Sequence, residues 1–275
     1  MPSEPVSASS TSRTALVRAC HPGPTLAVTV LVALLSVALG LDVATGVLVT
    51  AAVFTGQVTI GWSNDLIDAA RDRAVARHDK PLARGELSEA LVRKAIGVAG
   101  ASCIGLSLAC GWRSAAVHLL LGVASGWAYN LGFKRTAWSA LPYAVAFGAL
   151  PAVVSLAAAD RAWPPVWMMV TGAVLGVGAH LLNALPDLAD DDATGVRGLP
   201  QRLGAGRVRV LAPAVLLGGS VVATFGPGGA VPPGAWAGLA ACVVLALVAV
   251  LGRGKGPFVA AIGIALVDVA VLVLR

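Results

Sequence analysis

The chain has 275 residues, of which 57% are hydrophobic and only 12% are charged, and its mean hydropathy is +0.82. Soluble domains carry about 25% charged residues to cover their exterior, so this composition excludes an ordinary soluble protein. The net charge of +6 comes without a basic domain interleaved with aromatic residues, so we expect membrane lipid and an anionic substrate as partners, and no nucleic acid.

In chain order, residues 1–20 begin with a polar, Ser-rich stretch and are expected to form a disordered tail. Residues 21–275 are expected to form a single polytopic membrane domain. Nine apolar runs in it approach the length that spans a bilayer. We therefore predict an all-α integral membrane protein with nine transmembrane helices, at residues 25–41, 43–62, 95–111, 115–131, 141–159, 166–185, 210–225, 235–251 and 257–274.

The basic residues predict the orientation of these spans. With the N-terminus inside, 17 of the 20 Lys and Arg residues fall on the inner side, and only Arg113, Arg161 and Arg275 fall outside. The excess of Arg over Lys, with abundant Ala, Val and Gly, suggests a GC-rich genome and hence a bacterium. The sequence thus predicts a multi-pass protein of the bacterial plasma membrane with a cytoplasmic N-terminus.

One pattern occurs twice, each time at the end of an apolar run: Asn64-x3-Asp68-x3-Asp72 and Asn183-x3-Asp187-x3-Asp191. A step of four residues on a helix keeps the side chains on one face. Two such faces opposed would form a cage of oxygen ligands. Oxygen donors without a His or Cys cluster favour a hard ion, and Mg²⁺ usually binds through a few carboxylates and substrate phosphates. The pattern predicts a site for Mg²⁺ and a diphosphate at the cytoplasmic margin of the membrane.

The alternative is that these acids are solvated loop residues. It fits poorly, because ten of the 14 acidic residues lie in the two short segments 65–89 and 187–192. The offset between the copies, from position 64 to position 183, is 119 residues and suggests pseudo-repeated helix pairs. A basic loop containing Gly and Pro follows each copy and is a candidate lid. Pro186 either starts a short new helix at Asp187 or ends the helix there.

Three ionisable residues within the apolar runs are weaker candidates. Asp268 lies in the last run, where a charged group is unfavourable and is often functional, but it could also pair with a neighbouring helix. His118 and His180 are more often packing residues than ligands. His180 is the better candidate of the two, because it precedes Asn183 by three residues.

The first motif, followed by KPLARG at 80–85, resembles the first signature of the UbiA superfamily of intramembrane prenyltransferases, NDxxDxxxD with an RPL-x-x-G-like stretch. The second motif, followed by GLPQRLG at 198–204, resembles the second signature. The segment YNLGFKR at 129–135 resembles the Tyr and Lys-Arg segment that follows helix four of the family. The likeness covers nearly the whole chain. This sequence departs from the family at Lys80, where Arg is usual, and at Ala184, which puts acceptor recognition in doubt.

The resemblance implies a UbiA-type bundle and a role for each matching residue. It implies that Mg²⁺ and catalysis depend on Asp68, Asp72, Asp187 and Asp191. It also implies that the diphosphate of the donor is bound by Asn64, Lys80, Arg84, Tyr129, Lys134, Arg135 and Asn183.

The function so indicated is Mg²⁺-dependent transfer of an isoprenyl group from a polyprenyl diphosphate to an aromatic, quinone-precursor-like acceptor or to a lipid. A terpene cyclase of the same type would need the same ionising site but no acceptor. A transporter would instead place its acids near the bilayer midplane. A CDP-alcohol phosphotransferase would show an Asp-Gly-x2-Ala-Arg run, which this sequence lacks.

Overall fold

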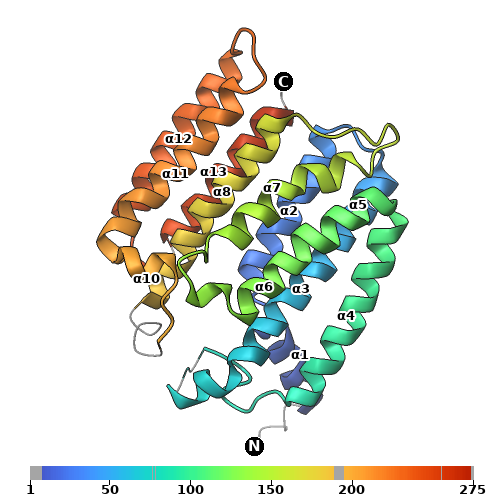
Figure 1. Ribbon diagram of the computed structural model, residues 1–275, viewed down its shortest axis with the longest axis vertical. Coiled ribbons are helices and arrows are strands. Elements are labelled where there is room, and N and C mark those ends of the chain that lie inside the picture. The colour runs from blue at the N-terminus through green and yellow to red at the C-terminus, as the bar shows by residue number, and fades with distance from the viewer. Residues whose placement is uncertain (1–7, 76, 78, 189–194, 255, 274–275) are drawn as a thin grey trace, which may run out of the picture.

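The structure is a computed structural model that describes residues 8–75, 77, 79–188, 195–254 and 256–273. Every regular element in these residues is helical (Figure 1). The first half contains α1 (Ala8–Ala19), α2 (Pro22–Ala38), α3 (Val43–Ala74), α4 (Glu89–Ala109), α5 (Trp112–Val117), the π-helix η1 (His118–Val123), α6 (Ala124–Leu131) and the 3-10 helix η2 (Phe133–Arg135). The second half contains α7 (Leu141–Ser155), α8 (Val166–Ala184), the 3-10 helix η3 (Leu185–Asp187), α10 (Leu199–Leu203), α11 (Ala205–Phe225), α12 (Pro233–Leu251) and α13 (Gly256–Val273).

Most of the long helices pack against the next one along the chain, and the last one packs against α2. Neighbours along the chain contact each other from α2 to α4 and from α7 to α13, and α13 returns to pack against α2. Glycines allow close approach of the backbones at the α7–α8 contact. A Cβ at Gly176 would lie 2.7 Å from the carbonyl oxygen of Tyr143, and Gly172 faces the carbonyl of Phe147 in the same way.

The buried apolar residues form two main clusters. The first joins α2, α3, α5, α7 and the start of α8 and includes Val49, Val53 and Val153. The second joins α8, α11, α12 and α13 and includes Leu182 and Leu216. α7 belongs to the first cluster and yet packs along α8, so it links the two halves.

The predicted number of nine membrane spans is not confirmed. Each predicted run falls in a helical stretch of the described chain, but only five single helices, α3, α4, α8, α11 and α12, are long and apolar enough to cross a membrane. A sixth is reached if α1 and α2, which are bent by 64°, count as one span. The other runs are shorter as helices: α7 ends at Ser155, and a π-helix interrupts the run from Trp112 to Leu131.

In the described part of the tail that was expected to be disordered, the structure has a helix, α1, at Ala8–Ala19. Ala15 and Ala19 are buried against the cytoplasm-predicted end of α3, and the indole N–H of Trp62 donates a hydrogen bond to the carbonyl oxygen of Leu16 at 2.9 Å. Arg18 forms an ion pair with Glu86 at 3.0 Å. The tertiary contacts of its small residues therefore order a segment whose composition alone favours disorder.

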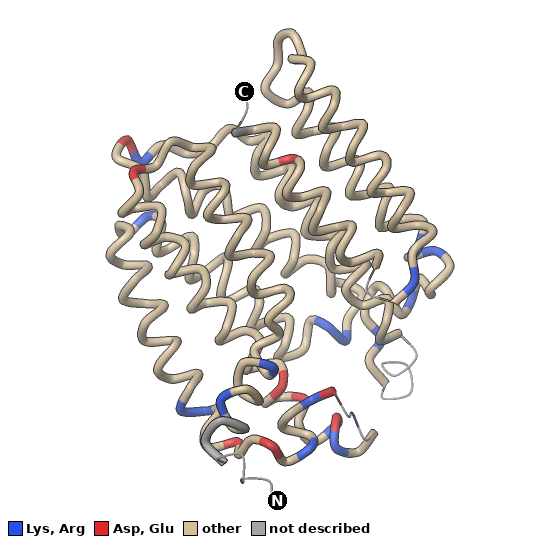
Figure 2. Tube along the Cα trace, turned by 180° about the vertical axis from the view of Figure 1, so that it is seen from behind, with Lys and Arg blue, Asp and Glu red and all other residues tan. Residues whose placement is uncertain are grey.

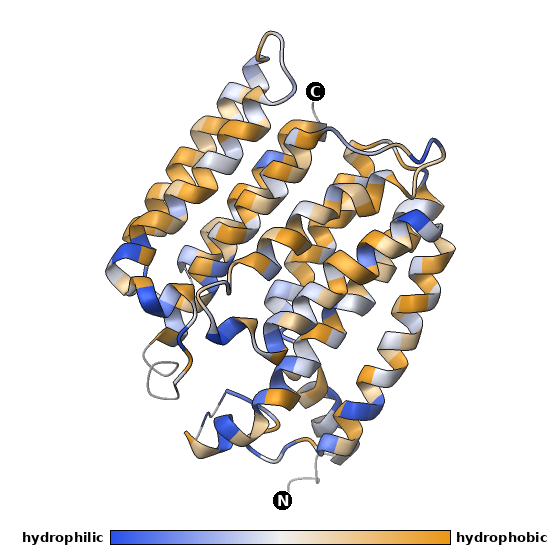
Figure 3. Cartoon of the chain, in the orientation of Figure 1, coloured by the Kyte–Doolittle hydropathy of each residue, from blue (hydrophilic) through white to orange (hydrophobic). Residues whose placement is uncertain are grey.

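The charged residues gather at one end of the bundle (Figure 2), where α3 ends and the loop to α4 begins. The helices between the two ends carry mostly apolar residues (Figure 3). This distribution is that of a multi-pass membrane protein whose polar end meets water. The first acidic motif lies at that charged end.

Candidate functional site

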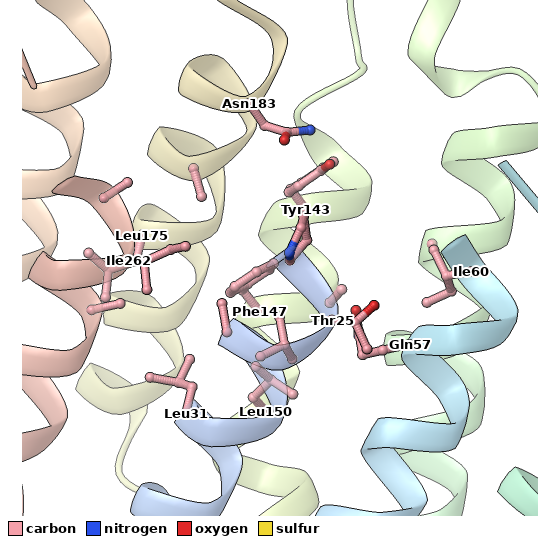
Figure 4. A pocket seen from close by; sticks show the side chains of 18 of the residues that line it. Thr25, Leu31, Gln57, Ile60, Tyr143, Phe147, Leu150, Leu175, Asn183 and Ile262 are labelled. Atoms are coloured by element: carbon pink, nitrogen blue, oxygen red, sulfur yellow. The ribbon is translucent and has the colours of Figure 1, made fainter. Parts of the chain in front are cut away.

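A cavity of ≈ 400 Å³ lies between α2, α3, α6, α7, α8 and α13. At the charged end of the bundle its lining is polar, and we call this part the polar mouth; it is formed by Asn64, Asp68, Asp72, Lys80 and Lys134. Further in, the lining is mainly apolar and aromatic (Figure 4). The cavity therefore joins a site for charged groups to a site for hydrocarbon.

One face of α3 supplies the acidic part of the polar mouth. The helix starts at Asp42, whose carboxylate accepts a hydrogen bond from the backbone N–H of Thr45 at 3.0 Å and caps the first turn. Its 32 residues span ~48 Å, longer than the ~30 Å of bilayer hydrocarbon. The last turns thus extend past the apolar part, and they place Asn64, Asp68 and Asp72 on the cavity wall.

Asp68 is held by two cations although only 3% of it is exposed. The ammonium of Lys134 donates hydrogen bonds to both carboxylate oxygens, at 2.7 and 2.6 Å, and the guanidinium of Arg71 lies 3.1 Å away. Arg71 also approaches Asp72 at 3.4 Å. Burial lowers the pKa of Lys134, and the attraction of Asp68 opposes this shift. The pair is therefore charge-compensated inside the protein.

A second ion cluster ties the loop after α3 to the helix. Lys80 donates to the buried carboxylate of Asp65 at 2.5 Å, and His21 contacts the same oxygen at 2.8 Å. Lys80 also lies 3.5 Å from the side-chain oxygen of Asn64. Near the start of the loop, Arg77 binds Asp79 at 2.8 Å and lowers the pKa of that carboxyl to about 2. Lys80 thus lines the polar mouth, and its ammonium group is paired with the carboxylate of Asp65.

Asn130 of α6 orients the first residue of the motif. Its side-chain N–H₂ donates to the carbonyl oxygen of Ile60 and to the hydroxyl of Ser63, both at 2.9 Å. Its side-chain oxygen accepts from Asn64 at 3.1 Å. Because both hydrogens of Asn130 are used on α3, the remaining oxygen fixes the amide orientation of Asn64.

Four rings form an aromatic wall next to the mouth. Tyr129 lies edge-on to Tyr143 and to His180, with centroid distances of 5.2 and 5.6 Å. Tyr143 lies 4.7 Å from His180 and stacks on Phe147 at 6.1 Å. The hydroxyl of Tyr143 interacts with the side chain of Asn183, and both face the pocket in Figure 4. This wall connects the first residue of the second motif to the cavity.

The structure brings together most of the predicted site residues whose side chains it describes, with two exceptions. Asn64, Asp68, Asp72, Lys80, Tyr129, Lys134 and Asn183 all line the cavity. Arg84 pairs with Glu86 at 2.8 Å and is half-exposed, and Arg135 is exposed; neither lines the cavity.

The rest of the second motif cannot be placed with the first. The side chain of Asp187 and the whole of Asp191 lie outside the described residues. α8 ends at Ala184, and a 3-10 turn follows at Leu185–Asp187. This agrees with a break of the α-helix at Pro186, which removes a backbone donor.

Sequence reasoning missed several residues of the site. Arg71 and Asn130 contact the first motif directly, and Tyr143 reaches the second. Gln57 lines the cavity as well. For Gln57 a signal exists in the sequence, since it is an amide within an apolar run and lies seven residues before Asn64, on the same helical face. For Asn130 and Tyr143 only the tertiary contact reveals the role.

The oxygen donors that the structure describes at the polar mouth are of the kind that binds Mg²⁺. Asp68 and Asp72 are carboxylates one helical turn apart, and both face the cavity. Within the described residues no group of three or more His, Cys, Asp or Glu side chains is gathered for a metal ion. Asp68 and Asp72 thus form one side of a possible site, and further ligands would come from the second motif or the substrate.

The sequence matches the model of the UbiA prenyltransferase family over residues 25–256. No curated protein sequence matches the chain. The fold is similar to that of an apo UbiA homologue from Aeropyrum pernix K1, with a TM-score of 0.74 and 17% identity over 92% of this chain and 98% of that chain.

Two further solved structures are similar. A UbiA homologue from Archaeoglobus fulgidus bound to DMAPP and Mg²⁺ has a TM-score of 0.69 and 15% identity, and the match covers 94% of this chain and 99% of that chain. A digeranylgeranylglyceryl phosphate synthase has a TM-score of 0.65 and 13% identity, over 96% of this chain and 98% of that chain. At these identities the likeness establishes the fold.

Proposed function

Since this chain belongs to the UbiA prenyltransferase family, we propose that it transfers an isoprenyl group from a prenyl diphosphate to an acceptor and releases diphosphate. The observation that carries the proposal is the single cavity that joins a charged mouth to an apolar, aromatic interior. A prenyl diphosphate has the same division between a charged head and a hydrocarbon tail. DMAPP and Mg²⁺ bound to the Archaeoglobus fulgidus homologue support this class of donor.

In this proposal the polar mouth binds the diphosphate. Asp68 and Asp72, with Asp187 and Asp191 of the second motif, would hold Mg²⁺, which when bound neutralises charge on the leaving group. Lys134, Arg71 and Lys80 supply donors for the diphosphate oxygens. In the structure Lys134 and Arg71 are held by Asp68, and they would share their hydrogen bonds with the substrate once it enters.

The aromatic wall would act on the other end of the breaking bond. When the C–O bond of the donor breaks, its electron pair leaves with the diphosphate and an allylic cation remains. The ring faces of Tyr129 and Tyr143 would stabilise that cation and keep water from it. An electron pair of the acceptor then forms the new bond to this carbon, and the acceptor loses a proton.

We propose further that the mouth faces the cytoplasm of a bacterium and that the protein resides in its plasma membrane. The support is the positive charge at the motif end of the bundle (Figure 2). A cytoplasmic mouth would receive soluble prenyl diphosphates directly.

The test uses the purified protein in detergent with Mg²⁺ and labelled donors of graded length, with and without membrane extract as a source of acceptor. We expect release of diphosphate and a labelled prenylated product that requires the extract. Release of diphosphate with a cyclic product in the absence of extract would favour a terpene cyclase. A protein that releases no diphosphate from any allylic donor would refute the proposal and leave a transporter as the alternative.

A further inference from the structure

Gln57 is a polar side chain in the interior of the cavity. It lies on the α3 face that carries Asn64 and Asp68, two helical turns or ~10 Å before Asn64. Figure 4 shows it projecting from α3 into the pocket, beside Ile60. It makes no hydrogen bond to any residue that the structure describes. Gln57 is half-buried, and its amide can donate hydrogen bonds to a ligand in the cavity and accept them from it.

His118 stands at the same level, against the residue that precedes Gln57. A Cβ at Gly56 would lie 3.2 Å from His118 Nε2, so the ring approaches α3 this closely only because Gly56 has no side chain. His118 is the first residue of the π-helix η1, a type of helical turn found frequently at functional sites. The imidazole lines the cavity.

The hydrogen bonds on the far side of the ring define what Nε2 can bind. The hydroxyl of Ser107 donates its single hydrogen to the carbonyl oxygen of Cys103 at 2.6 Å. Ser107 therefore accepts from His118 Nδ1–H, at 2.8 Å. With Nδ1 protonated, Nε2 carries the lone pair of the neutral ring, and the hydrogen bond of His118 to a described residue is the one at Nδ1.

The pair defines the chemistry of the group that it would bind. Gln57 offers an N–H donor, and His118 offers a lone pair, and a hydroxyl group both accepts and donates one hydrogen bond. The cationic side chains of the cavity lining, Arg71, Arg77, Lys80 and Lys134, belong to the end of α3, the loop after it and η2. A carboxylate at the level of Gln57 would thus find no positive partner.

We propose that Gln57 and His118 bind a neutral hydroxyl group of the acceptor, which makes the acceptor a phenol or an alcohol. This inference rests on the proposed prenyl transfer. The ~10 Å between Asn64 and Gln57 leaves room for the diphosphate, the reacting carbon and one ring of an acceptor. The hydroxyl site would hold that ring with its reactive carbon towards the mouth, and it would give a partner to the amide of Gln57 and to Nε2 of His118.

The test measures binding of three probes to the purified protein in one detergent: hydroquinone, its dimethyl ether 1,4-dimethoxybenzene, and benzoate. We expect the wild-type protein to bind hydroquinone roughly tenfold more tightly than the dimethyl ether, the effect of one or two buried neutral hydrogen bonds. Gln57→Leu and His118→Phe should each reduce this preference to less than threefold. Gln57→Leu breaks no internal hydrogen bond, so it tests the site even if His118→Phe folds poorly.

Thr171→Val is the matched control, because Thr171 also lines the cavity and its hydroxyl has no partner in the described chain. Thr171→Val should keep the full preference for hydroquinone over the dimethyl ether. Because all variants are measured in one detergent, the partition of the probes into micelles is the same for each and does not affect the comparison. Equal affinity of wild-type protein for the two neutral probes, tighter binding of benzoate than of hydroquinone, or a preference that survives in Gln57→Leu would overturn the inference.

Diphosphate release from geranyl diphosphate and Mg²⁺, measured on the same preparations, separates the two proposals. A wild-type protein with the probe preference but without diphosphate release would refute the prenyl transfer and leave a hydroxyl-binding site. Release of diphosphate without the preference would refute the hydroxyl site alone.

Discussion

Asp68 combines burial with full charge compensation at the polar mouth. Taking a carboxylate out of water is unfavourable by several kcal/mol unless partners replace the solvent, and here Lys134 and Arg71 supply them. Such an arrangement holds the carboxylate and its partners in place. The same three side chains therefore provide both signs of charge that a metal-bound diphosphate requires.

We predict that Asp68→Asn lowers diphosphate release by at least 100-fold, because the neutral amide cannot hold a divalent cation as a carboxylate does. Size-exclusion profiles should show a folded protein, since the amide still accepts hydrogen bonds from Lys134. Glu89→Gln is the control: Glu89 is an exposed acid at the start of α4 that pairs with Arg73 and Arg93, and its loss should change the rate less than twofold. Activity within threefold of wild type in Asp68→Asn would exclude a catalytic role.

Lys134 and Arg135 form a natural matched pair, since they are adjacent in sequence and differ in burial. Lys134 lines the cavity, whereas Arg135 is exposed. We predict that Lys134→Gln raises the KM for the donor more than tenfold, because a donor to the diphosphate is lost. Arg135→Gln should change it less than twofold. Equal effects in both variants would show that Arg135 also reaches the substrate or that both act only through membrane topology.

At the level of elements, the loop between α3 and α4 is attached at several points and is not a free lid. Lys80 binds Asp65, and at the far end Glu86 binds Arg84 and, from α1, Arg18. His21 of the bend between α1 and α2 contacts Asp65 too. Opening the mouth through this loop would therefore require these ion pairs to break, and the ion pair of Lys80 is the one nearest to the motif.

We predict that Lys80→Met increases the rate of trypsin cleavage in the loop at Arg77 and Arg84, because the anchor to the buried Asp65 is lost. A non-hydrolysable diphosphate analogue with Mg²⁺ should slow cleavage of the wild-type loop by engaging its cations. Arg93→Gln, which removes an exposed pair on α4, should leave the cleavage rate in the loop unchanged. Identical digestion of wild type and Lys80→Met, with and without the analogue, would exclude a gating role.

The positions of most helices were predictable because apolar runs dominate the sequence. Their bounds were less so, since α3 continues to Ala74, past the predicted end of its apolar run at residue 62. The helix α1 was not predictable from the sequence, because its order depends on contacts of Ala15 and Ala19 with residues more than 40 positions away. The helical spacing of Asn64, Asp68 and Asp72 predicted one shared face. The partners of that face, such as Asn130 and Tyr143, come from other helices, and local pattern carries no information about them.

At the scale of the whole molecule, the cavity lies between the two halves of the bundle. α3 brings the first motif from one apolar cluster, and α8 brings Asn183 from the other. α7 packs against α8 and places Tyr143 between them. A ligand that contacts both motifs would join the halves, so its binding should stabilise the entire fold and not only the residues it touches.

We predict that Mg²⁺ and geranyl diphosphate together raise the Tm of the purified protein by several degrees, whereas either alone has a small effect. At a ligand concentration 100 times Kd the stabilisation is about 2.7 kcal/mol, and the metal and the diphosphate each complete the site for the other. Asp68→Asn should show no shift, because one side of the site is lost. EDTA should remove both the shift and the diphosphate release, and added Mg²⁺ should restore both. An equal shift with geranyl diphosphate in EDTA would mean that the cations of the mouth bind the donor without a metal ion, and the acids would then have another role.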